Sequence, residues 1–206
     1  MLNKLANIIS IVFHPLLMTT LLVMTLYFFA PSTVLPIRED SIKILLLVIV
    51  VLTLILPLLS VGMLKLTNNI SSFRLESQKE RLMPFFFITI YYGITTYFFA
   101  DRLVLGYTMI ILFASVTITI FLVTVITFFF KISAHTAGTA GVLGCLIAIH
   151  LKYIDSMLFW PIVVALVLHG VVSSSRLYLN THDAKEIHLG AVLGFVVNFG
   201  AIYFLT

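Results

Sequence analysis

The stretch Ser173–Leu189, SSSRLYLNTHDAKEIHL, is the longest polar interruption in the C-terminal half of the chain. It lies between two apolar runs, Met157–Val172 and Gly190–Thr206, and it carries an arginine, a lysine, two histidines and two carboxylates. Charged side chains beside hydrocarbon are costly, so such a cluster is by default a candidate functional site. The alternative interpretation is a solvated loop whose long side chains reach water.

The composition of the whole chain is typical of a membrane protein. Of its 206 residues, 61% are hydrophobic and 10% are charged, which is more apolar surface than a soluble core of this size can bury. We therefore predict one integral membrane domain over residues 1–206, an all-α polytopic bundle of transmembrane helices. The basic residues behind the net charge of +4 lie mostly between apolar runs, and we expect no nucleic-acid partner.

Seven apolar segments are long enough to be candidate spans, so we expect about six to seven transmembrane helices. They are Leu5–Ala30, Ile42–Leu66, Pro84–Ala100, Leu103–Phe130, Ala137–Leu151, Met157–Val172 and Gly190–Thr206. Consecutive spans alternate in direction, so the second, fourth and sixth loops emerge on one side. These loops contain Thr67–Met83, Lys131–Thr136 and Ser173–Leu189. One composite site at the membrane surface requires this arrangement, whereas independent solvated loops do not.

The last of these loops contains a histidine and a carboxylate at helical spacing. If the seventh helix begins near Thr181, His182 and Glu186 are four residues apart on one face. The carboxylate then accepts a proton from one ring nitrogen and leaves the other nitrogen as nucleophile or base. Arg176 offers a bidentate fork to phosphate or carboxylate. A pair at this spacing is, taken alone, more often structural.

The fourth loop, KISAHTAGTAG from residue 131, resembles the start of a helix. Ser133 and Thr136 are placed to cap it, and free backbone N–H groups there make an anion site beside His135. Close helix packing is the expected role of the glycines that follow at a spacing of three, namely Gly138, Gly141 and Gly144.

The second loop provides further cations. Arg74 and Arg81 are seven residues apart, so on a helix they project in nearly the same direction, and Lys79 reaches them through its flexible stem. An interfacial amphipathic helix is the structural alternative for Thr67–Met83, and it is compatible with phosphate binding.

Three histidines outside the loops are predicted to be structural. His14 lies inside the first predicted span, and His150 and His169 lie near or within the fifth and sixth. We expect each to be hydrogen-bonded between helices. The single cysteine, Cys145, has no partner for an internal disulfide and is predicted to be a small buried side chain.

The ordered set of clusters resembles the type 2 phosphatidic acid phosphatase superfamily, whose motifs are Lys-x6-Arg-Pro, Pro-Ser-Gly-His and Ser-Arg-x5-His-x3-Asp. The third motif here reads Ser175-Arg176, five residues, His182, three residues and Glu186. The resemblance covers the order of all three motifs and more than half of the chain.

The first two motifs depart further from the family pattern. The second reads ISAH at residues 132–135, with isoleucine and alanine in place of proline and glycine. The first reads Arg74, six residues and Arg81, with its proline delayed to Pro84, so Arg81 and Lys79 are both candidates for the clamp. The match spans roughly residues 74–84, 131–138 and 175–186.

The resemblance implies a membrane-embedded lipid phosphatase with a phosphohistidine intermediate. His182 would attack phosphorus while Glu186, or Asp183, holds its ring, and His135 would protonate the leaving alkoxide and then activate water. No metal and no cofactor are implied. The residues implied to bind the substrate phosphate are Arg74, Lys79, Arg81, Ser133, Ser175 and Arg176.

The implied partner is a lipid phosphate, namely phosphatidic acid, phosphatidylglycerol phosphate or a polyprenyl pyrophosphate, and the expected location is a bacterial cytoplasmic (inner) membrane. No residue selects among these substrates or defines the oligomeric state. The basic residues do not decide which face carries the site, because the arginines are needed for phosphate in either orientation. The alternative function is a catalytically weak or inactive relative that binds or moves an anionic lipid.

Overall fold

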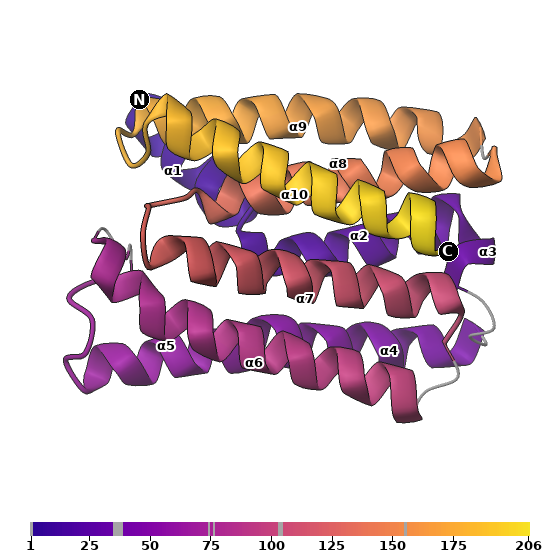
Figure 1. The fold of residues 1–206 in the computed structure, drawn as a ribbon, viewed down its shortest axis with the longest axis horizontal. Coiled ribbons are helices and arrows are strands. Elements are labelled where there is room, and N and C mark those ends of the chain that lie inside the picture. The colour runs from indigo at the N-terminus through magenta and orange to yellow at the C-terminus, as the bar shows by residue number, and fades with distance from the viewer. Residues whose placement is uncertain (1, 35–38, 74, 76, 103–104, 155) are drawn as a thin grey trace.

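The computed structural model describes residues 2–34, 39–73, 75, 77–102, 105–154 and 156–206. The predicted phosphate-binding residue Arg74, and Leu103 at the start of the fourth predicted span, lie outside these residues. Within them the chain is helical (Figure 1). The elements are α1 (Leu2–Val12), α2 (Pro15–Phe29), α3 (Pro31–Val34), α4 (Glu39–Val50), the π-helical η1 (Val51–Ile55), α5 (Leu56–Leu66), α6 (Gln78–Arg102), α7 (Tyr107–Thr127), α8 (Ala134–Tyr153), the 3₁₀-helical η2 (Ser156–Leu158), α9 (Phe159–Tyr178) and α10 (Ala184–Leu205).

Six of the described helices are long and apolar enough to cross a membrane. They are Ser41–Leu66, which joins α4, η1 and α5, and α6, α7, α8, α9 and α10. The pair α1 and α2 passes the same test together and is bent by 61°, which gives up to seven spans. The predicted all-α polytopic bundle of about six to seven spans is therefore confirmed.

The bend between α1 and α2 corrects the prediction of one continuous first span over Leu5–Ala30. Pro15 has no backbone N–H and crowds the preceding turn, so the residue before it favours extended backbone. His14 accordingly has φ −65° and ψ 138°, and α2 begins at Pro15. His14 therefore lies at a helix break rather than inside a helix.

The prediction of an amphipathic helix over Thr67–Met83 is wrong in its first part. The described residues from Thr67 to Ser77 form turns and bends. Leu75 has a left-handed backbone with φ 50°, which a continuous right-handed helix does not permit. The Glu80 carboxylate accepts a hydrogen bond from the Ser71 N–H at 2.8 Å, which draws the turns back onto the start of α6.

Two further helix starts differ from the prediction. The third span was expected to begin at Pro84, but α6 begins earlier and Pro84 lies inside it. The seventh span was predicted from Gly190, with its helix beginning near Thr181, but α10 begins at Ala184 because Asp183 caps it by accepting a hydrogen bond from the Glu186 N–H at 2.8 Å. His182 therefore precedes the helix.

Glycine allows α8 and α10 to pack almost backbone to backbone. A Cβ at Gly144 of α8 would lie 2.8 Å from the Phe195 carbonyl oxygen, and one at Gly190 of α10 would lie 2.5 Å from the Ser133 carbonyl oxygen. The close packing predicted for the α8 glycines is confirmed, with Gly138 contacting α2 instead of α10.

Buried polar groups join α7 to α10 in the bundle interior. Asn198 accepts a hydrogen bond from the Ser115 hydroxyl at 2.9 Å and donates to the Thr119 hydroxyl at 2.9 Å. Polar groups inside a membrane span need such partners, because water is absent there. These contacts fix α10 and therefore the loop in front of it.

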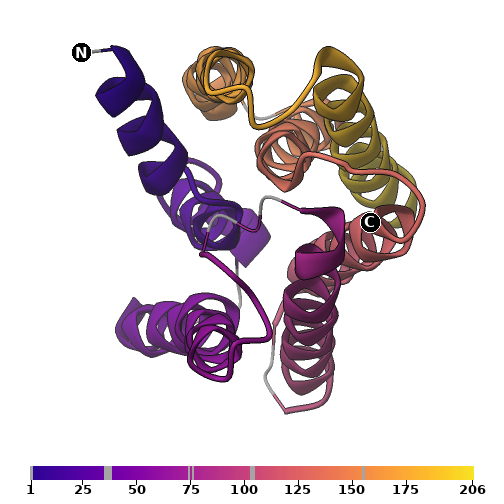
Figure 2. The same ribbon diagram turned by 90° about the vertical axis from the view of Figure 1, so that its left-hand side faces the viewer.

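The loops that precede α6, α8 and α10 lie at the end of the bundle that carries the N-terminus, and the C-terminus lies at the other end (Figure 1). Figure 2 is viewed from this loop end, along the helices, and shows α1, which carries the N-terminus, at one edge of the bundle. The three polar clusters are therefore on one side, as the alternation of spans predicts.

Candidate functional site

A cavity of about 1180 Å³ runs from the loop end into the bundle. It is lined by residues of α1, α2, α5, α6, α7 and α8, by the end of α9 with the segment that follows it, and by Asn198 of α10. The charged side chains among its described lining residues are all basic: Lys4, Arg81, Lys131 and Arg176. Its inner part is mainly apolar, so one end favours an anion and the other favours hydrocarbon.

His182 lies in this cavity and is held by Glu186. Its Nδ1 is 2.5 Å from the Glu186 Oε2, and the histidine side chain is buried. A carboxylate accepts hydrogen bonds, so Nδ1 carries the proton and Nε2 keeps its lone pair. The sequence predicted this pair on a helical face, and the contact forms although His182 precedes α10.

Arg81 links all three loops. Its Nε donates to the Leu75 carbonyl at 2.7 Å, and its Nη1 donates to the Ile132 carbonyl at 3.3 Å. The same Nη1 is 3.4 Å from the His182 Nε2. A guanidinium only donates, so His182 Nε2 is the acceptor, which agrees with the tautomer that Glu186 imposes.

The pKa of His182 is lowered from its ordinary value of 6.5 to about 2. Burial is the largest cause, and the positive charges of Arg81 and Arg176 add to it. His182 is therefore neutral near pH 7. A neutral ring with a fixed Nδ1 proton is the form in which Nε2 can act as a nucleophile.

Two further cations approach the cavity from different elements. Arg176, in the last turn of α9, lines the cavity with a buried Nε that has no hydrogen-bond partner within the described residues. Lys131 lines it as well and donates to the Thr181 carbonyl at 2.9 Å, which fixes the segment that carries His182. A buried donor without a partner is costly, and an anionic ligand would satisfy it.

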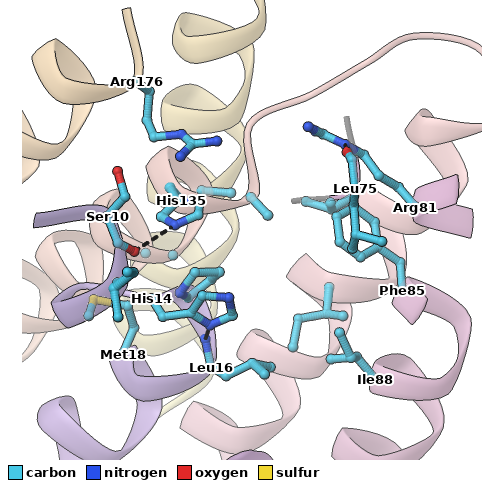
Figure 3. A pocket seen from close by; sticks show the side chains of 18 of the residues that line it. Ser10, His14, Leu16, Met18, Leu75, Arg81, Phe85, Ile88, His135 and Arg176 are labelled. Carbon is cyan, nitrogen blue, oxygen red and sulfur yellow. Dashed lines mark hydrogen bonds between the residues drawn. The ribbon is translucent and has the colours of Figure 1, made fainter. Parts of the chain in front are cut away.

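His135 occupies the first turn of α8 and lines the same cavity. Its Nε2 is 3.1 Å from the Ser10 carbonyl oxygen of α1 and acts as the donor in that bond. Its ring lies edge-on to the ring of His14, with 5.5 Å between ring centroids. Figure 3 shows the two histidines on one side of the cavity, with Arg176 beyond His135 and Arg81 on the opposite side.

Three predicted phosphate-binding residues are not brought to the cavity. Lys79 is exposed and is not among the described lining residues. The Ser175 hydroxyl donates to the Val171 carbonyl at 2.8 Å, and the Ser133 hydroxyl accepts from the Thr136 N–H at 3.4 Å. Ser133 thus caps α8, as predicted, but both hydroxyls face their own helices.

His14 lines the cavity, although the sequence predicted only a structural role for it. The signal was present, because a histidine directly before proline in an apolar run lies where a helix breaks. His169, by contrast, hydrogen-bonds Thr139 of α8 at 2.8 Å, which is the interhelical role predicted for it.

Within the described ranges, no three His, Cys, Asp or Glu side chains are grouped closely enough to hold a metal ion. The chain matches no protein-family model, no curated protein and no solved structure. What the site does must therefore be argued from its own geometry.

Proposed function

We propose that the protein is a membrane-embedded phosphatase that hydrolyses a lipid phosphate monoester or pyrophosphate through a phosphohistidine intermediate. The observation that carries the proposal is His182, a buried neutral histidine whose Nδ1 is held by Glu186 and whose Nε2 meets Arg81. A nucleophile, an orienting carboxylate and a phosphate-binding guanidinium lie in contact, in a cavity with basic charges.

In the proposed first step, the lone pair of His182 Nε2 attacks phosphorus in line with the leaving oxygen. A P–N bond forms, the P–O bond breaks, and the leaving oxygen takes a proton from the imidazolium form of His135, which the negative charge of the bound substrate favours over the neutral ring. In the second step His135 accepts a proton from water, the water oxygen attacks phosphorus, and the P–N bond breaks to release phosphate. Arg81 moves from His182 Nε2 to the phosphoryl oxygens when substrate enters.

The charges around the cavity favour this chemistry. Arg81, Lys131 and Arg176 come from three different segments and converge on one cavity. Spread around the equatorial phosphoryl oxygens, they stabilise the charge of the transition state, which is the main contribution of a protein to phosphoryl transfer. The unpartnered Nε of Arg176 is one donor available for that purpose.

The cavity shape supports a lipid rather than a soluble phosphate ester. Beyond the basic end, its wall is built from apolar side chains that include Leu22, Ile88, Val116, Ile120 and Val142. Phosphatidic acid, phosphatidylglycerol phosphate and polyprenyl pyrophosphates all combine an anionic head with a hydrocarbon tail that suits such a wall. We place the protein in a bacterial cytoplasmic membrane by its resemblance to the phosphatase superfamily.

A second candidate is a protein that binds or moves an anionic lipid without hydrolysis. The observation that favours it is that the Nε2 atoms of both histidines already have partners. His182 Nε2 contacts Arg81, and His135 Nε2 is hydrogen-bonded to the Ser10 carbonyl. A site that keeps these contacts with ligand present would bind a phosphate without attacking it.

Turnover separates the two functions. Purified protein in detergent is expected to release inorganic phosphate from a lipid phosphate without added metal, and vanadate is expected to inhibit it. His182→Gln should abolish release because glutamine cannot form the intermediate. Release by His182→Gln at the parent rate would refute the nucleophile. Saturable lipid-phosphate binding with no release by the parent would support the second function.

A further inference from the structure

We propose that His14 is a substrate-binding residue that donates a hydrogen bond from its Nε2 to a phosphoryl oxygen of the ligand. The proposal deepens the proposed function, on which it rests for the nature of the ligand. It concerns the helix break between α1 and α2, a segment outside the three motifs that predicted the site.

The helix break determines which ring nitrogen of His14 carries the proton. The Leu16 N–H donates to the His14 Nδ1 at 3.3 Å, so His14 caps α2 with its own side chain. A nitrogen that accepts this bond carries no proton, and the proton of the neutral ring is therefore on Nε2. Pro15 fixes the backbone there, so the direction of the ring is fixed too.

His14 lines the cavity, and one of its ring nitrogens is unused. His14 lines the cavity together with His135, His182 and Arg176, and its Nε2 makes no hydrogen bond within the described part of the chain. Figure 3 shows Arg176, His135 and His14 following one another along one side of the cavity. His135 donates its Nε2 proton to the Ser10 carbonyl, so it leaves His14 as the histidine on that side with an unused donor.

A second, independent observation on the same side of the cavity points to an anion. The buried Nε of Arg176 also lacks a hydrogen-bond partner among the described residues. Two unused donors in a cavity whose charged lining residues are basic match the oxygen-rich surface of a phosphoryl group. The carboxylate of Glu186 is hydrogen-bonded to His182, and Glu186 is not among the described residues that line the cavity.

Two substitutions of His14 test its two roles separately, namely the capping of α2 and the hydrogen-bond donor at Nε2. Asparagine is among the best capping residues, so His14→Asn keeps a cap on the Leu16 N–H and loses the distal donor. Glutamine places an amide N–H close to the position of the histidine Nε2, so His14→Gln keeps a donor and loses the cap. The thermal unfolding midpoint of each variant in detergent reports whether the break has been damaged.

The test is binding of a short-chain phosphonate analogue of phosphatidic acid, whose C–P bond is not hydrolysed, to the full-length protein by calorimetry. Diacylglycerol with the same chains is the matched ligand without a phosphoryl group. His14→Asn is expected to bind the phosphonate about tenfold more weakly than the parent and diacylglycerol equally well, and His14→Gln to recover part of the loss.

Equal phosphonate affinity of His14→Asn and parent would overturn the proposal. An equal loss in both variants would overturn it as well, because the donor that glutamine retains would then have no effect on binding. Failure of the parent to bind the phosphonate would also overturn it. A parent that binds the phosphonate but hydrolyses no lipid phosphate would instead refute the proposed catalysis, while the His14 comparison would still stand.

Discussion

The two walls of the cavity are attached to the bundle in different ways. On the wall formed by α8 and α10, the two backbones are hydrogen-bonded to each other, since the Ser133 N–H donates to the Glu186 carbonyl at 3.2 Å, and the Thr136 hydroxyl adds a bond to the Ile187 carbonyl at 3.0 Å. On the wall formed by α1 and α2, a side chain makes the hydrogen bond to α8, from His135 to the Ser10 carbonyl.

This difference agrees with the different residues that the two walls present to the cavity. The α8–α10 wall holds His182 and Glu186, whose distance must be kept for any reaction at Nε2. The α1–α2 wall presents His14 and apolar side chains, among them Ile8 and Ile11, which line the cavity and are exposed.

The largest expected effect breaks the α8–α10 wall itself. A Cβ at Gly194 would overlap the Ala137 carbonyl, so Gly194→Ala is expected to force the helices apart and to destabilise the protein by about 3 kcal/mol. Gly200 lies on the same helix with nothing within 4 Å of an added Cβ, and Gly200→Ala should be neutral or slightly stabilising. Thermal unfolding in detergent compares them, and equal midpoints would show that the two helices are not in backbone contact.

A smaller effect is expected from loosening one contact on that wall. Glu186→Gln keeps the size of the side chain but no longer holds the Nδ1 proton of His182 as a carboxylate does, so hydrolysis of a lipid phosphate should fall roughly a hundredfold. Asp183→Asn is the matched control, because asparagine preserves the cap on α10. An equal fall of the initial rate in both variants would point to the helix start rather than to the histidine.

The sequence predicted the α8–α10 wall well because its key features are local. The spacing of His182 and Glu186 survives although α10 begins two residues after His182, since one turn of chain joins them in either case. The meeting of Arg81 with His182, 101 residues apart, follows from the alternation of spans. Such inferences need only periodicity and the number of spans.

The N-terminal wall and the turns before α6 were predicted poorly because they depend on backbone direction. The left-handed backbone of Leu75 turns the chain before α6, and the Leu75 carbonyl accepts the hydrogen bond from the Arg81 Nε. The helix break at His14 is encoded by Pro15, but the tilt that brings the ring to His135 comes from packing. Periodicity carries no information about either.

The last expected effect, the smallest of the three when taken for one pH unit, is a pH dependence that separates His182 from the rest of the cavity. Its pKa is lowered from 6.5 to about 2 by burial and by the charges of Arg81 and Arg176, so below pH 6.5 the unfolded chain binds a proton that the folded chain does not. Stability therefore falls as the pH drops below 6.5, by at most about 1.4 kcal/mol per pH unit from this one group.

His182→Gln removes that proton and should flatten the acid side of the curve of unfolding midpoint against pH, relative to the parent. Both proteins keep His14 and His135, so the difference between the two curves isolates one ring on the α8–α10 wall. Parallel curves between pH 6.5 and about pH 4 would mean that the folded protein takes up the proton as readily as the unfolded chain. A ring that is protonated in this way has no lone pair for phosphorus, and the rigid wall would then lack the group that the proposed chemistry requires.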